Sequence, residues 1–544
     1  MNPDRRDFVV AGAGSLLALA GVPPLVRQQG THDLVIRGGT VFDGSGSPGV
    51  EADIAISGGK IAQVGRRLAG RGTEEIDARG LAVSPGFVDL HSHGDGSMNE
   101  DPRMESLVHQ GITTIVVGQD GSSRATGGGL GAAADSARFA RLLTSIDTLR
   151  PAVNVASMIG LGSVRGRVVG NTDRPATPDE LRTMTAMVEA ALADGACGAS
   201  SGLEYTPGAF ASTDELIALC KPLASRRLPY ATHMRNEDDR LLDSIDESIA
   251  VARGAGCPLQ ISHLKTQGPR NWSKLDTVFA RVDGAAAAGL DVAFDRYPYI
   301  AYATGLTNLF PVWSRDGGTA AFLARLTDST VAPRIRAETL AKVDLIGGWE
   351  NVHISSVRDS VDRAAEGKRL GSYAKSISTD PYQLMVAMLG RNRGSIGMVG
   401  FAMSEENLDR ILAHPRGMVA SDGGSFAIEG PTRSGSPHPR GLGTFPRVLG
   451  RYVRERKALK LERAINKMTA LPASRIRLVD RGRLAPGLAA DVVVFDPATI
   501  ADRATFEQPF QYPVGMKAVV VNGVVALRDG QRGDRLTGRS LRPG

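Results

Sequence analysis

The chain has 544 residues, of which 42% are hydrophobic and 22% are charged, proportions typical of a globular protein rather than of a disordered or membrane-embedded one. Its 64 Lys and Arg residues against 58 Asp and Glu residues give a net charge of +6 without a long basic run, which argues against a dedicated nucleic-acid-binding protein. The three cysteines, Cys197, Cys220 and Cys257, form no CxxC pair and exclude a disulfide scaffold.

Residues 1–31 are predicted to be a signal peptide of the twin-arginine type. Arg5 and Arg6 precede an apolar run from Phe8 to about Leu25 that is rich in small residues. A membrane anchor is the alternative, because this run approaches the ~18 residues that can span a bilayer. The small residues and the lack of a second apolar span in the sequence favour cleavage. We therefore expect bacterial export to the periplasm or secretion, with no stable membrane span after the signal is removed.

Both ends of the remaining chain are predicted to form β-strands. Short alternating runs separated by Gly and Asp turns occupy residues 32–85, for example DLVIRGGTVFD and DIAISGGKIAQVG. A matching pattern returns in residues 475–535 as GLAADVVVFDP and KAVVVNGVVALRDGQ. Together the two segments predict one small β-sandwich domain built from both ends of the chain.

Residues 86–474 alternate short apolar runs with helical patterns, which is typical of βα units around a parallel sheet. Eight segments are predicted strands: GFVDLHSH, GITTIVVGQD, VNVASMIG, GASSGLEY, PYATHM, PLQISHLK, DVAFDRYPY and GMVASDG. Capping residues at Thr177 and Ser212, and the glycines of ALADGA and VARGAG, mark the starts and ends of helices between them. The eight units predict an α/β fold, a (β/α)8 TIM-like barrel. Two segments, near 301–395 and 424–445, are predicted insertions, and the segment near 424–445 is predicted to be a loop.

Four histidines and one aspartate lie at the C-terminal ends of these predicted strands: His91, His93, His233, His263 and Asp422. In a (β/α)8 barrel that end is the catalytic face. His91 and His93 are two residues apart on a strand and therefore point to the same face. Neutral imidazoles combined with carboxylates suit zinc and related divalent ions, so the pattern predicts a metal site.

Several of these motifs resemble those of a known family. FVDLHSH, YATHMRNE, QISHLK, the ASDG strand end, HPRGLGTFPRVLGRYVRE and RGRLAPGLAADVVVFDPATI are similar to the amidohydrolase superfamily, and within it to the D-aminoacylase (N-acyl-D-amino-acid deacylase) branch, over about residues 33–530. The resemblance implies a metal-dependent barrel with a flanking β-sandwich, holding one or two divalent ions such as zinc and hydrolysing N-acyl-D-amino acids. In the matching positions, His91 and His93 would hold one metal with Asp422, and His233 and His263 would hold the other.

One departure from the family pattern concerns the turn after the second strand. The family commonly has a cysteine in a GNCG-like turn, whereas this chain has GQDG, which puts Asp120 at that position. A carboxylate can bridge two cations, so Asp120 is predicted to be a shared metal ligand. The alternative is a turn residue that caps a loop. Glu204, at the end of the fourth strand, is the reserve bridging ligand.

The predicted reaction is direct hydrolysis of the amide by metal-activated water, without an acyl-enzyme. Asp422 is the predicted catalytic residue, which would take the proton of the water and pass it to the departing nitrogen. By resemblance, Lys265 with Tyr297 or Tyr299 would bind the α-carboxylate of the small-molecule N-acyl amino acid substrate, although Lys265 can also be read as a solvated rim residue. Arg296 is a further candidate for binding an acidic side chain of the substrate, although strand alternation points it away from Tyr297. Tyr205 is expected either beside the metals or as a filler of the barrel interior. His438 and Arg440 are expected either to cover the pocket or to belong to a structural loop.

Two other functions remain as alternatives. A hydrolase of cyclic amides or dipeptides usually carries a carboxylatable lysine at the fourth strand, and SSGLEY has none. A noncatalytic barrel that acts as a binding protein would lack metal ligands, whereas this chain has them or a carboxylate in their place. The sequence predicts neither the oligomeric state nor the acyl group and side chain of the substrate.

Overall fold

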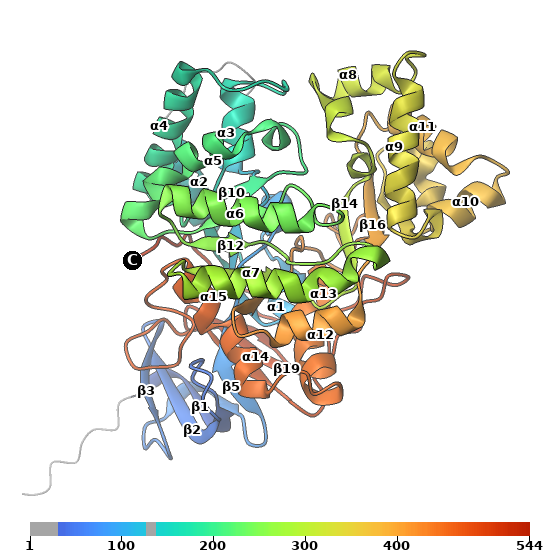
Figure 1. Ribbon diagram of the computed structural model, residues 1–544. Helices are drawn as coiled ribbons and strands as arrows, with labels where there is room; N and C mark the ends of the chain where they lie inside the picture. Colours follow the sequence, from blue (N-terminus) through green and yellow to red (C-terminus); the bar gives the residue numbers. More distant parts are fainter. Residues whose placement is uncertain (1–30, 127–137) are drawn as a thin grey trace, which may run out of the picture.

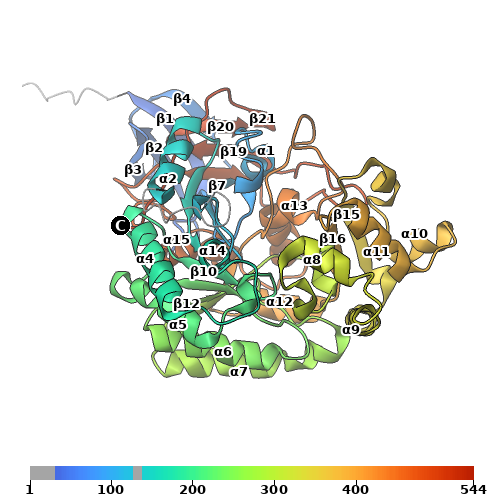
Figure 2. The ribbon, with the colours of Figure 1, turned by 90° about the horizontal axis from the view of Figure 1, so that it is seen from above.

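The structure, a computed structural model, describes residues 31–126 and 138–544, so nearly all of the predicted signal peptide lies outside the described residues. A nine-stranded sheet combines strands from both ends of the chain (Figures 1 and 2). Its members are β1 (His32–Val41), β2 (Val50–Ser57), β3 (Lys60–Gly65), β4 (Gly72–Asp77), β5 (Ala82–Pro85), β18 (Val492–Phe495), β19 (Met516–Val521), β20 (Val524–Arg528) and β21 (Gln531–Arg532). The two halves join where β5 pairs antiparallel with β18 and places Val83 opposite Val494. The strands predicted at both ends are confirmed.

Two parallel sheets contain the eight segments predicted as strands in the middle of the chain, and all eight are confirmed, one of them, VNVASMIG, as the two strands β8 and β9. One contains β6 (Phe87–Asp89), β7 (Ile112–Val117) and β8 (Asn154–Ser157); the other contains β9 (Ile159–Gly160), β10 (Ala199–Gly202), β11 (Tyr230–His233), β12 (Leu259–Ile261), β13 (Val292–Arg296) and β17 (Gly417–Val419). Only Met158 separates β8 from β9, and an isolated parallel bridge joins Ser92 to Gly423. Residues of these strands are buried almost throughout, as expected for parallel strands covered by helices.

Helices alternate with these strands and lie outside them (Figure 1). They include α1 (Glu105–His109), α2 (Arg138–Leu149), α3 (Leu161–Val168), α4 (Pro178–Asp194), α5 (Thr213–Cys220), α6 (Leu241–Ala255), α7 (Leu275–Ala287), α12 (Glu405–Ala413), α14 (Leu461–Met468) and α15 (Ala470–Arg475). The predicted helix signals act as expected: Thr177 and Glu180 form a capping box at the start of α4, and the Ser212 hydroxyl caps α5. Gly195 and Gly256 end α4 and α6 in the left-handed conformation, which glycine adopts without steric cost.

The predicted insertion near 301–395 forms a lobe with its own sheet and core, which extends to Phe401. β14 (Ala301–Gly305), β16 (Gly397–Phe401) and β15 (Val352–Ser356) form an antiparallel sheet in that order, accompanied by α8 (Gly318–Arg325), α9 (Ala332–Leu345), α10 (Leu370–Ser376) and α11 (Pro381–Arg391). These elements stand to one side of the parallel strands, in yellow and orange in both views (Figures 1 and 2). Because β14 follows β13 closely, the lobe begins next to the C-terminal end of the parallel sheet.

The second predicted insertion, 424–445, is a loop only in part. Residues 424–439 contain no helix or strand, but α13 (Arg440–Arg447) begins inside the segment and continues into a π-helical turn over Val448–Glu455. The Gly and Pro content predicted a loop over the whole of 424–445, and this prediction is wrong for residues 440–445, which are helical. Pro439 does not prevent the helix, because it stands directly before the first helical residue, where a proline is tolerated. In the part of the chain that the structure describes, no helix is long and apolar enough to cross a membrane.

Candidate metal centre

Six side chains from distant parts of the chain converge at the C-terminal ends of the parallel strands. His91 and His93 follow β6, Asp120 follows β7, His233 ends β11, His263 follows β12 and Asp422 follows β17. They form two groups that can each hold a metal ion, with ligand atoms within 4.8 Å of one another: His91, His93, Asp120 and Asp422 in the first, and Asp120, His233 and His263 in the second. All six residues predicted as metal ligands are therefore brought together.

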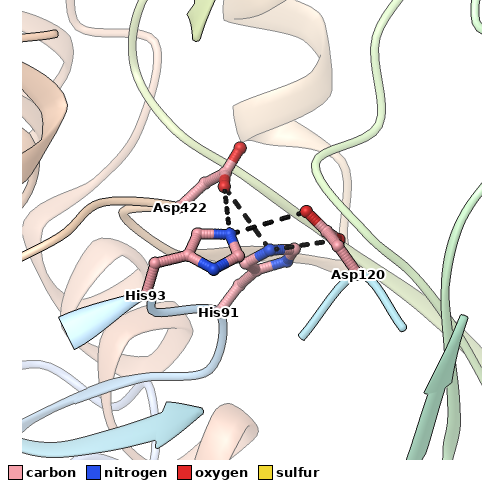
Figure 3. A group of neighbouring side chains, drawn as sticks. All are labelled: His91, His93, Asp120 and Asp422. Carbon is pink, nitrogen blue, oxygen red and sulfur yellow. Dashed lines mark hydrogen bonds and ion pairs between the residues drawn. The ribbon is translucent and has the colours of Figure 1, made fainter. Parts of the chain in front are cut away.

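The first group is drawn in Figure 3. Asp422 Oδ1 lies 3.1 Å from His93 Nε2 and 3.5 Å from His91 Nε2, and Asp120 Oδ1 lies 3.4 Å from His91 Nε2. The two carboxylates thus approach the same face of the histidine pair. Backbone pairing fixes this arrangement, because the Asp422 amide donates to the His91 carbonyl at 2.8 Å and the Ser421 amide donates to the Asp89 carboxylate at 2.8 Å.

The second group shares Asp120 with the first. Asp120 Oδ1 lies 3.6 Å from His263 Nε2, Asp120 Oδ2 lies 3.9 Å from His233 Nδ1, and these two histidine nitrogens are 2.9 Å apart. Asp120 therefore occupies the position between the two groups that a bridging carboxylate requires. The arrangement favours the prediction of a shared ligand over the alternative of a simple turn residue.

Three of the six side chains stand on unusual backbone. Asp120, His263 and Asp422 have φ angles of 51°, 38° and 51°, a region that residues other than glycine rarely adopt. Beside Asp120, a Cβ on Gly118 would lie 2.2 Å from the Met158 carbonyl oxygen, so the GQDG turn needs glycine there. Backbone of this kind is costly and persists where the surrounding structure holds it, which is typical of functional sites.

The electrostatics of the cluster attract positive charge. Burial alone would lower the pKa of His91 and His93, but Asp120 and Asp422 outweigh burial and raise both, that of His93 to about 9. Within the described residues, both ring nitrogens of His91, Asp120 Oδ1 and His233 Nε2 are buried without a hydrogen-bond partner. A divalent cation among these nitrogen and oxygen donors would satisfy the unpaired atoms beside Asp120 and balance the carboxylates, so the residues present fit a zinc-type ion.

Glu237 belongs to the site, and the sequence analysis missed it. Its buried carboxylate lies 3.1 Å from His263 Nδ1 and 2.6 Å from Lys265 Nζ. Burial would raise the pKa of Glu237, but Lys265 and the histidines outweigh burial and lower it, so the group is an anion. Glu237 and the Lys265 ammonium, whose Nζ lies 2.7 Å from the same nitrogen, hold His263 Nδ1 on the side away from Asp120, so that Nε2 faces Asp120. The only sequence signal is its position four residues after His233, in THMRNE.

Glu204 and Asp295 occupy similar positions behind other histidines. Glu204 Oε2 lies 3.5 Å from His233 Nε2, the ring nitrogen other than the one beside Asp120, and Asp295 Oδ1 lies 3.6 Å from His91 Nδ1. The structure thus places Glu204, the predicted reserve bridging ligand, behind a ligand rather than between the two groups. With His233 and Glu237 it forms a third group of possible ligand atoms.

A cavity of about 300 Å³ opens onto the cluster. Lys265 lines it, but its ammonium is held by Glu237 rather than being the solvated rim residue of the alternative interpretation. Tyr297 also lines it, and its buried hydroxyl has no hydrogen-bond partner among the described residues. Tyr299 does not reach the cavity, because its hydroxyl is buried 3.4 Å from the Pro439 carbonyl. Only one of the two tyrosines predicted to bind substrate therefore faces the cavity.

The remaining predicted residues divide between the cavity and the core. Arg440 lines the cavity and donates to Asp422 Oδ2 at 2.7 Å; Tyr205 lines it with its ring 4.6 Å from that of His233. His438 is buried and contacts the Ala301 carbonyl, so it does not cover the pocket. Arg296 is also buried and, unlike Tyr297, lies outside the cavity lining, so it does not face the substrate side chain. Its guanidinium lies over the Tyr297 ring at 4.1 Å.

Comparison with known proteins agrees with this geometry. Residues 74–527 match the amidohydrolase family. An N-acyl-D-glutamate deacylase from Alcaligenes xylosoxydans xylosoxydans is 37% identical, over 94% of this chain and 96% of the relative. The solved N-acyl-D-glutamate deacylase from Bordetella bronchiseptica, complexed with zinc and a phosphonate that mimics the tetrahedral intermediate, gives a TM-score of 0.80 at 34% identity, over 94% of this chain and 100% of that one. The solved structure of a D-aminoacylase with a binuclear metal centre gives a TM-score of 0.79 at 33% identity, over 94% of this chain and 100% of that one. The chain belongs to the amidohydrolase family, as its motifs predicted.

Proposed function

We propose that this protein is a metal-dependent amide hydrolase that converts N-acyl-D-amino acids to a carboxylate and a free D-amino acid. The observation that carries the proposal is the convergence of four histidines and two aspartates in two groups that share Asp120, with all of them except His91 lining one cavity. The similar proteins are named deacylases of N-acyl-D-amino acids, and one of them binds zinc with a mimic of the tetrahedral intermediate. Zinc, as one or two ions per chain, is the metal that this donor set suits.

The proposed architecture has two domains. Residues 86–474 would form a (β/α)8 barrel, closed by the Ser92–Gly423 bridge and by the continuity of β8 with β9 across Met158. Residues 32–85 and 475–535 would form the β-sandwich domain, supported by the nine-stranded sheet that both segments share. In this arrangement the metal centre lies where the βα loops of a barrel open, the usual place of its active site.

A divalent ion held by these residues lowers the pKa of water and polarises a carbonyl oxygen. Asp422 is the group placed to accept the proton of the attacking water, and it returns that proton to the amide nitrogen as the C–N bond breaks. Burial would raise the pKa of Asp422, but Arg440 and the nearby histidines outweigh burial and lower it. Asp422 is therefore held as a carboxylate, the form that a proton acceptor requires, while Arg440 fixes its other oxygen.

The substrate carboxylate needs positive charge and hydrogen-bond donors in a buried cavity. Lys265, Arg440 and the unpaired Tyr297 hydroxyl line the same cavity as the metal centre, and together they offer such a site. Tyr297 is positioned from behind by the Arg296 guanidinium, which stacks on its ring and donates to the Tyr299 carbonyl at 2.7 Å.

A serine nucleophile is disfavoured by the structure. The stretch GASSG at residues 198–202 matches the G-x-S-x-G pattern of serine hydrolases. Ser200, however, is fully buried in β10, and its hydroxyl donates to the Gly118 carbonyl at 2.6 Å. It supports the GQDG turn instead, which agrees with direct hydrolysis without an acyl-enzyme.

Export is part of the proposal. Arg5 and Arg6, followed by an apolar run of small residues, support a twin-arginine signal and a periplasmic or secreted enzyme. Replacing both arginines by lysine should leave the protein in the cytoplasm, as cell fractionation would show; recovery of the variant in the periplasm would contradict the proposal.

The proposed reaction is tested by a panel of N-acetyl-D-amino acids, their L-enantiomers, hydantoins and dipeptides. The zinc-loaded protein should hydrolyse D-substrates, with much lower rates for the L-enantiomers and the cyclic amides. Hydrolysis of hydantoins or dipeptides instead would favour the cyclic amidase or dipeptidase alternative. Absence of turnover with every substrate would favour a noncatalytic binding protein.

A further inference from the structure

We infer that the cavity accepts N-acyl-D-amino acids whose side chain carries no charge. The inference rests on the proposed function and names the substrate class within it. It separates this chain from the N-acyl-D-glutamate deacylases that it resembles, because their names indicate an acidic side chain.

The positive charges of the cavity wall are already paired. Among the residues that the structure describes, Lys265 and Arg440 are the Lys and Arg side chains that line the cavity. Lys265 binds Glu237 at 2.6 Å, Arg440 binds Asp422 at 2.7 Å, and all four side chains are buried. Lys265 and Arg440, each already paired with a protein carboxylate, can together bind the α-carboxylate of the substrate. No further lysine or arginine of the described lining is then left for a second substrate carboxylate.

The negative charge of the wall opposes a second substrate carboxylate. Asp120, Glu204, Glu237 and Asp422 all line the cavity. Asp120 and Asp422 are proposed metal ligands, whereas Glu204 and Glu237 lie against His233 and His263 as further carboxylates of the wall. A carboxylate on the substrate side chain would meet Glu204 and Glu237 and would find no unpaired Lys or Arg among the described lining residues, which is unfavourable.

The lobe supplies an uncharged part of the wall. Tyr302, Ala303 and Thr304 of β14, and Asn308 of the 3₁₀ turn Leu306–Leu309, line the cavity. The Tyr302 hydroxyl is buried without a hydrogen-bond partner among the described residues, and the Thr304 hydroxyl donates to the Tyr205 hydroxyl at 3.2 Å. Small and neutral groups of this kind fit an apolar or amide side chain, which needs no counter-ion.

Three further cations lie behind this wall rather than in it. Arg235, Arg315 and Lys342 line a neighbouring cavity of about 220 Å³, which shares Glu204 and Asn308 with the first. Arg235 is ion-paired with Glu247. Arg315 donates to the Glu204 carbonyl, and Lys342 is ion-paired with Asp238. An acidic side chain would have to pass the Glu204 carboxylate to reach them. They therefore do not provide acidic specificity to the metal-site cavity.

The test compares substrates that differ in charge but hardly in size. The kcat/KM of the zinc-loaded protein should be at least about tenfold higher for N-acetyl-D-glutamine than for N-acetyl-D-glutamate, and for N-acetyl-D-asparagine than for N-acetyl-D-aspartate. Equal or faster hydrolysis of the acidic member in both pairs would overturn the inference and leave the proposed function intact. If no D-substrate at all is hydrolysed, the proposed function fails, and the inference fails with it.

Substitution at Ala303, a partly exposed wall residue, tests where the side chain of the substrate lies. Ala303→Lys should shift the glutamate-to-glutamine ratio of kcat/KM at least about tenfold toward glutamate, and Ala303→Gln, of similar length and no charge, should not. The ratio is measured on one preparation, so it does not depend on the fraction of folded or metal-loaded protein. A ratio that is unchanged by lysine, or equally changed by glutamine, would contradict the inferred placement.

Discussion

Replacing Glu237 by glutamine should weaken metal binding without removing any metal ligand. The substitution keeps the size of the side chain but removes the negative charge that lies 3.1 Å from His263 Nδ1 and 2.6 Å from Lys265 Nζ. The Glu237 carboxylate then no longer helps to hold His263 Nδ1 and the Lys265 ammonium together, and the orientation that turns His263 Nε2 toward Asp120 is less favoured. Lys265, with a side chain only 2% exposed, loses its counter-ion.

The expected loss of metal affinity is about 10- to 100-fold, the usual effect of removing such a supporting carboxylate, which corresponds to about 1.4–2.7 kcal/mol. The stability of the metal-free protein should also fall, by on the order of 3 kcal/mol, because a buried ion pair is broken. Competition of the metal-free protein with a chromogenic zinc chelator measures the affinity, and urea unfolding measures the stability.

Glu215→Gln is the matched control. Glu215 is also buried and ion-paired, with Arg165 at 3.0 Å, and it contacts no residue of the metal centre. This variant should lose stability in the same way but keep the zinc affinity of the unsubstituted protein. If Glu237→Gln folded normally and bound zinc as tightly as the unsubstituted protein, the positioning role of Glu237 would be refuted.

Three further predictions concern the ligands and the response to acid. Asp120→Ala should lower the zinc content by at least one ion per chain in a sample loaded with two, measured by mass spectrometry; unchanged stoichiometry would rule out bridging. Asp422→Asn should lower kcat by about 10²–10⁴-fold with a smaller change in KM, and a kcat within tenfold of the original would exclude its role in proton transfer. Burial lowers the pKa of His109 to about 4 in the folded protein. As the pH drops from about 6.5 to 4, His109 is protonated in the unfolded chain but not in the folded one, so the free energy of unfolding falls, by at most about 3 kcal/mol. Urea unfolding of His109→Phe, which retains a ring against Tyr512, should show less of this loss, and an identical pH dependence would contradict the reasoning.

The strands and the metal ligands were predictable because strong local constraints apply to them. A strand buried on both faces reads as a short apolar run, and all eight such runs proved to be strands. Strand geometry restricts the direction in which a side chain at the end of such a strand can point. His91, His93 and His233 could therefore be placed at one edge of the sheet from their spacing alone, and Asp422 from its position after the last run.

Residues beyond the strand ends were not predictable in the same way. Glu237 lies in a loop, where no periodicity fixes the direction of a side chain, and its role depends on contacts with His263 and Lys265, which follow β12 and are about thirty residues away in sequence. Arg296 ends its strand, and its contact with the Tyr297 ring could not be predicted from the alternation of faces. Tyr302 and Asn308 reach the cavity through the lobe, whose packing depends on pairing between β14 and β16, nearly a hundred residues apart.

The central claim is that the clustered histidines and aspartates bind a metal that hydrolysis requires. Titration of the metal-free protein with zinc, while the release of a D-amino acid from its N-acetyl derivative is followed, tests this claim most directly. The rate should rise from near zero in proportion to bound zinc and saturate at one or two ions per chain, with no acyl group found on the protein. A metal-free protein that hydrolyses the substrate as fast as the loaded one, or a trapped covalent acyl-protein, would contradict it.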